Sequence, residues 1–143
     1  MTENTGARYG GVPGSRGRTT IADVVVEKIA GMAARDVRGV YALGSGFARS
    51  MGSMRERMPG AGSGKSATRG VSVEVGELQA AIDLELVVDY GVAITDVAAA
   101  VRENVISAVE RMAGREVVEV NITVSDVKLP DEEDEGEERQ RIQ

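Results

Sequence analysis

The 143 residues match the length of one ordinary domain, which can bury an apolar core without covalent cross-links. The chain contains neither Cys nor His, which excludes disulfides, the common zinc sites and the usual nucleophile–base pairs. Its net charge is −6, and an acidic protein repels phosphate backbones, so we expect no nucleic-acid partner.

Composition divides the chain into a central domain and two terminal segments. Residues 1–18 are rich in Gly and Arg, and residues 130–143 carry a run of acids. Neither segment can bury enough apolar area to offset its ordering entropy, so we predict a disordered N-terminal arm and a disordered acidic tail. A nucleic-acid or lipid role for the arm stays open, although its short cluster of arginines favours a solvated tail. Residues 19–129 then form one domain.

The first part of this domain reads as a helix and a short strand. Thr20 offers an N-cap, and the helix should end near Arg35. A stripe of apolar residues at helical spacing predicts the face that packs on the core. Its members are Ile21, Val24, Val25, Ile29, Met32 and Ala33. The residues after the helix, 37–43, predict a short strand.

A long insertion at 44–70 interrupts the pattern with Gly, Ser and Arg. A connection of this length inside a compact domain is either functional or disordered. The insertion carries apolar residues at spacings of four, three and four, which permits a short amphipathic helix with an edge for contact with a partner. These candidate interaction residues are Phe47, Met51, Met54 and Met58.

The second half of the domain reads as a hairpin followed by a strand–helix–strand unit. Val71, Val73 and Val75 alternate with polar residues, and a strand from Ala80 returns after a turn. On that strand we expect one apolar face that packs on the core: Ile82, Leu84, Leu86, Val88 and Tyr90. A helix capped by Thr95 and closed by Gly114 leads to a last strand, which should run parallel to its predecessor. The core-facing residues of the last strand are predicted to be Val118, Val120, Ile122 and Val124.

These patterns predict a two-layer α+β domain. Two main helices cover one face of a mixed sheet of about four strands, in the order α-β-β-β-α-β. The opposite face of the sheet should stay polar, because successive side chains of a strand point to opposite faces and the residues between the apolar ones are mostly polar. The order of the strands within the sheet cannot be derived from the pattern.

Two motifs in the sequence suggest chemistry, and each also has an ordinary structural explanation. The run PGAGSGKS, residues 59–66, ends like a phosphate-binding loop, but it has Pro59 where that loop needs a glycine, and no strand precedes it. We therefore expect a linker around Lys65 and no nucleotide site. A set of carboxylates should share the open sheet face, where a hard cation is an alternative to plain solvation. They are Glu74, Asp83, Glu85, Asp89 and Glu119.

Two stretches resemble the bacterial alkaline-shock-protein family, also called the general or envelope stress response family. Residues 19–43 resemble its N-terminal helix and first strand, and residues 87–127 resemble its C-terminal half. The most specific features are the Tyr90-Gly91 pair and the run from Gly114 to Val124. From the residues alone, Tyr90 is expected to close the buried face of its strand, with ligand binding as the less favoured role.

The resemblance implies a non-enzymatic, cytoplasmic stress-response protein that acts through self-association and partner binding. We therefore expect no catalytic residues, no cofactor and no metal, and a homo-oligomer as the working form. The alternative is an adaptor that docks at the inner face of the cell membrane through a partner, either a small membrane protein or a family paralogue. No apolar run approaches the ~20 residues of a membrane span, so we expect no span of the chain's own.

Overall fold

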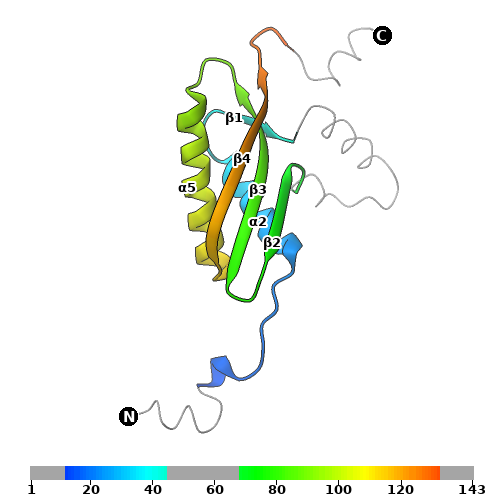
Figure 1. Cartoon of the computed structure of the whole chain (residues 1–143), viewed down its shortest axis with the longest axis vertical. Helices are drawn as coiled ribbons and strands as arrows, with labels where there is room; N and C mark the ends of the chain where they lie inside the picture. The colour runs from blue at the N-terminus through cyan, green and yellow to red at the C-terminus, as the bar shows by residue number, and fades with distance from the viewer. Residues whose placement is uncertain (1–11, 45–67, 133–143) are drawn as a thin grey trace, which may run out of the picture.

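Two helices and a mixed sheet make up the computed structural model, which describes residues 12–44 and 68–132 (Figure 1). The described elements follow the predicted order α-β-β-β-α-β after a short 3-10 turn, and the α+β class is confirmed. In chain order they are η1 (Pro13–Ser15), α2 (Asp23–Arg35), β1 (Val40–Leu43), β2 (Val71–Val75), β3 (Gln79–Asp89), α5 (Ile94–Ala113) and β4 (Glu116–Lys128).

The long strand β3 is the centre of the sheet, and it pairs with all three other described strands. β4 runs parallel to β3 along one edge, as the strand–helix–strand pattern predicts. β1 and β2 both pair antiparallel with the other edge, β1 around Val88 and β2 from Leu84 to Ala80. Because these two pairings use different lengths of β3, β1 and β2 lie end to end along that edge.

The junction between β1 and β2 is a close approach of two glycines. The backbone N–H of Gly44 donates to the carbonyl of Glu85 at 2.7 Å, and the carbonyl of Gly70 accepts from the N–H of Glu85 at 2.9 Å. Both ends of segment 45–67 therefore meet at the same residue of β3. The insertion therefore connects β1 to β2 at the point where these two strands lie end to end along the edge of β3.

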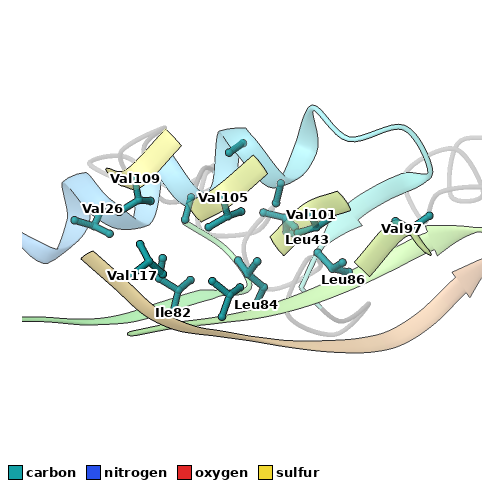
Figure 2. Close-up of a cluster of buried hydrophobic side chains, with 14 of the residues drawn as sticks. Val26, Leu43, Ile82, Leu84, Leu86, Val97, Val101, Val105, Val109 and Val117 are labelled. Carbon is teal, nitrogen blue, oxygen red and sulfur yellow. The ribbon is translucent and has the colours of Figure 1, made fainter. Parts of the chain in front are cut away.

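Both helices pack on the same face of the sheet, and the core lies between the two layers (Figure 2). Figure 2 shows the labelled valines of α2 and α5 pointing toward the labelled side chains of β3. The side chains at the centre of this core have 3% or less of their surface exposed. They include Val26 of α2, Leu43 of β1, Ile82, Leu84, Leu86 and Val88 of β3, and Val101, Val105 and Val109 of α5.

Helix α2 packs through a face that only partly matches the predicted stripe. Ala33 is buried, and Ile21 and Ile29 pack partly buried against the core, whereas Val24, Val25 and Met32 are exposed at 45%, 43% and 55%. The buried face consists mainly of small residues: Val26, Ala30, Gly31, Ala33 and Ala34. Small side chains let α2 approach the sheet and α5 closely, and Asn104 of α5 donates to the carbonyl of Ala33 at 2.7 Å across the helix pair.

Strand β4 also departs from simple alternation, because its register against β3 shifts between Ala80 and Ala81. Val117 pairs with Ala80 and is 8% exposed, whereas Val118 is 51% exposed. The prediction that Val118 faces the core is therefore wrong. A bulge places two residues of β4 opposite one step of β3, so the core-facing set begins at Val117 and resumes at Val120.

The helix starts differ from the predicted caps, whereas one helix end agrees. Ala22 and Ala93 occupy the N-cap positions of α2 and α5, and neither makes a side-chain cap hydrogen bond, so Thr20 and Thr95 do not serve as caps. Gly114 ends α5 in the left-handed conformation, with φ of 66°, as predicted. None of the described helices is long and apolar enough to cross a membrane.

Candidate interaction site

The face of the sheet opposite the helices carries the predicted carboxylates. In the pairing register, Glu74 of β2 and Glu119 of β4 both lie opposite Ala81 of β3. Asp83, Glu85 and Asp89 follow along β3 at alternating positions, which places their side chains on the same side. The structure thus brings all five carboxylates together on one surface, which we call the open face.

An asparagine links two of these carboxylates. The side-chain amide of Asn121 donates to Oδ1 of Asp83 at 3.0 Å and to Oε2 of Glu119 at 3.0 Å. Both carboxylates thereby receive a neutral donor and are held in place across β3 and β4. Within residues 12–44 and 68–132, no group of three or more acidic side chains is arranged to hold a metal ion.

A shallow groove of about 290 Å³ lies at one end of the open face. Residues 74–76, 79–81 and Val118 line it, so it spans β2, β3 and β4 beside the β2–β3 turn, at the lower end of the sheet in Figure 1. Its wall is apolar at Ala81 and Val118 and acidic at Glu74. The bulge in β4 makes this groove, because regular alternation would have turned Val118 into the core.

The β2–β3 turn next to the groove is held to the end of α5. Nε of Arg115 donates to the carbonyl of Gly76 at 3.1 Å, and Nη1 of the same side chain donates to the carbonyl of Ala113 at 3.2 Å. Leu78, within this turn, has 78% of its surface exposed. The groove therefore lies beside a turn that Arg115 ties to α5, and the exposed apolar side chain of Leu78 is at its rim.

The other end of the open face contains a small buried patch. Val87, the one apolar residue among the carboxylates of β3, is only 1% exposed although it faces away from the helices. Ala42 of β1 and Asp126 of β4 flank it in the register. Nearby, Nζ of Lys128 lies 5.1 Å from the ring centroid of Tyr41, within range of a cation–π contact.

Tyr90 is not a core residue, contrary to the prediction. β3 ends at Asp89, and Tyr90 is 64% exposed in the following turn, where its N–H donates to the carbonyl of Lys128 at 3.0 Å. Gly91 has a φ of +100°, which an L side chain rarely adopts. Because Tyr90 lies in the turn at Gly91 and not in β3, it does not follow the alternating pattern of the strand, and it is exposed to solvent.

The predicted interaction residues Phe47, Met51, Met54 and Met58 lie outside the described residues, as does the PGAGSGKS run with Lys65. Where the chain resumes, Arg69 lies near Arg35 at the end of α2. The pKa of the Arg35 guanidinium is lowered, first by burial and second by the positive charge of Arg69. Two arginines therefore lie near each other beside the end of the insertion, whereas carboxylates lie along the open face.

Val118 is the residue of the site that sequence reasoning missed. The available signal was the doublet Val117-Val118 at the start of the last strand, which fits either of two alternations. The side of the doublet that enters the core depends on the register against β3.

The fold and the open face define a small α+β domain with helices on one side of the sheet and carboxylates on the other. The chain belongs to the Asp23 (alkaline shock protein 23) family, which has a cell envelope-related function and whose profile matches residues 12–129. This membership confirms the resemblance found in the sequence and places the chain in a stress-response, envelope-related family.

Two kinds of relative support the assignment. The chain is 32% identical over 117 residues to a "Stress response regulator gls24 homolog" of Streptococcus pyogenes serotype M1, a match that covers 82% of this chain. It is 34% identical over 113 residues to the "Uncharacterized protein YqhY" of Bacillus subtilis, which covers 79% of this chain and 78% of that protein. The chain spans 62% of the length of the streptococcal relatives it matches. No solved structure matches the chain.

Proposed function

We propose that this protein acts in the envelope stress response as a non-enzymatic binding protein, through self-association and partner binding. The observation that carries the proposal is the open face. It covers the length of the central strand and carries five carboxylates and a groove, and only its far end at Val87 is buried. A face of this kind is available to a second protein surface.

The segment proposed for contact is the set Phe47, Met51, Met54 and Met58. In the sequence these apolar side chains stand among Gly, Ser and Arg, and burying them against another protein would remove them from water. Their methionines are suited to such contacts, because the unbranched thioether adapts to irregular surfaces.

Light scattering after size-exclusion chromatography of the whole chain tests the proposal. We expect a mass that is a multiple of 15.1 kDa and that falls on dilution. A mass of 15.1 kDa at every concentration would contradict self-association. Phe47→Asp with Met54→Asp should reduce the mass to that of one chain while the thermal transition stays in place, because a buried carboxylate without a partner is costly at an interface.

The matched control places the same two charges on described apolar residues of α2. Val24→Asp with Met32→Asp changes exposed side chains and should leave the assembly intact. If the Phe47/Met54 variant keeps its assembly and its stability, the segment is not the contact. If that variant loses monomer stability instead, the segment packs on its own domain.

A second candidate function is an adaptor that docks at the inner face of the cell membrane through a small membrane protein or a family paralogue. The cell envelope-related description of the family favours it. Co-purification with membranes only when such a partner is co-expressed would support this function, and binding to protein-free vesicles would argue against it.

A further inference from the structure

We propose that the groove on the open face is the acceptor surface of self-association, and that it receives the apolar and basic segment 47–58 of a second copy. This inference rests on the proposed function and deepens it by naming the receiving surface. Two properties of the described residues carry it: the shape and apolar content of the groove, and its charge.

The groove offers apolar surface where a solvated sheet face would have none. Val118 is 51% exposed on the open face, and Leu78 is 78% exposed at the adjoining turn. The bulge that turns Val118 outward leaves the core closed, because Val117 fills the inward position. A flexible Met or a Phe side chain of a partner fits such a shallow, partly apolar hollow of about 290 Å³.

Charge complements the apolar contact. Glu74 lines the groove, and Glu119 and Asp83 follow on the same face, held by Asn121. Segment 45–67 carries four cationic side chains against the single acid Glu56, which gives it a net charge of +3. Acidic and basic surfaces of this kind steer association and suppress the pairing of like surfaces.

The contact joins two different surfaces, a donor segment and an acceptor groove, so it is heterologous. A variant that lacks only the acceptor still has a donor, and a variant that lacks only the donor still has an acceptor. Mixing the donor-deficient variant with the acceptor-deficient variant should therefore restore one contact. Restored assembly is a more specific result than the loss of assembly in either variant alone.

The acceptor variant is Glu74→Lys with Val118→Lys, in the whole chain. It fills the groove and reverses its charge, and both positions are at the surface, so the thermal transition should be unchanged. We expect the apparent dissociation constant of self-association to rise at least about tenfold. A 1:1 mixture with Phe47→Asp/Met54→Asp should form a species of two chains at a concentration at which each variant alone is monomeric in light scattering.

The matched control is Thr123→Lys with Asp126→Lys, which makes the same change in net charge on the same face away from the groove. It should assemble like the unmutated chain. The inference is overturned if the acceptor variant assembles normally, if the control is impaired equally, or if the mixture stays monomeric. Self-association itself then still stands, whereas a monomeric unmutated chain would contradict the proposed function as well.

Discussion

At the scale of single residues, the tightest constraint is the meeting of Gly44 and Gly70 beside Glu85. Gly70 has a φ of +76°, and a Cβ added there would meet the backbone nitrogen of Gly44, lie 2.8 Å from its Cα and lie 3.0 Å from the carbonyl oxygen of Glu85. Backbone atoms held by hydrogen bonds to β3 cannot easily move aside. The two ends of the insertion can share one position on the sheet only because neither carries a side chain.

We therefore expect Gly70→Ala to destabilise the protein by about 2–4 kcal/mol, as backbone strain and steric overlap add. Gly91→Ala is the matched control. Gly91 also has a positive φ, +100°, but nothing lies within 4 Å of its added Cβ, so only the strain of about 1–2 kcal/mol applies. Urea unfolding of both variants measures the difference, and equal losses would show that the close approach to Gly44 does not constrain the fold.

At the scale of elements, helix α5 protects one edge of the sheet. β4 has a free edge in the described part of the chain, and an open edge strand is a template for unwanted pairing. The carboxylate of Glu110 accepts from the N–H of Val117 at 3.0 Å, and Nε of Arg102 donates to the carbonyl of Val120 at 3.1 Å. Two side chains of the same helix thus form hydrogen bonds with backbone groups of the first half of β4, one with an N–H and one with a carbonyl.

Glu110→Ala should cost about 1–2 kcal/mol, because it leaves the part-buried N–H of Val117 without its acceptor. Glu110→Gln keeps a carbonyl oxygen in the same place and should lose clearly less. Thermal unfolding followed by circular dichroism gives the comparison. If Gln and Ala are equally destabilising, a carbonyl acceptor for the N–H of Val117 does not account for the contribution of Glu110.

At the scale of the whole molecule, the core is built from residues 21–127, and the two ends add little to it. Pro13–Ser15 is an exposed turn with no buried residue. At the other end, Glu132 accepts from the N–H of Leu129 at 2.9 Å, and its carbonyl accepts from Nζ of Lys128 at 2.7 Å, all at exposed positions. Solvent competes with such contacts, so their net contribution is small.

We expect a chain of residues 19–129 to fold by itself, with a midpoint within about 5 °C of the whole chain, which corresponds to roughly 1 kcal/mol for a domain of this size. Differential scanning calorimetry of both chains measures the shift. A larger loss would show that an end segment packs on the core. The same shortened chain should retain self-association, because both the insertion and the groove are kept.

The pattern of residues along the chain was enough to predict the type and order of the two main helices and the four described strands. Period-two alternation along residues 82–88 and helical spacing along 97–109 follow from which side of each element meets water, and that choice is local. Gly114 could be assigned as a helix end because a left-handed residue there favours glycine whatever packs nearby. Family membership also followed from the sequence, since residues 19–43 and 87–127 lie within the matched range of 12–129.

The tertiary structure alone decided which side of an ambiguous element faces inward. α2 carries two apolar faces, and the one with alanines and Gly31 was buried because it permits the closer approach to α5 and the sheet. Val118 points outward because the register of β4 against β3 shifts at this point. The sequence of β4 alone does not contain this register, because the register depends on how β4 pairs with β3. The groove depends on that shift, so the surface on which the further inference rests could be found only after the strands were paired.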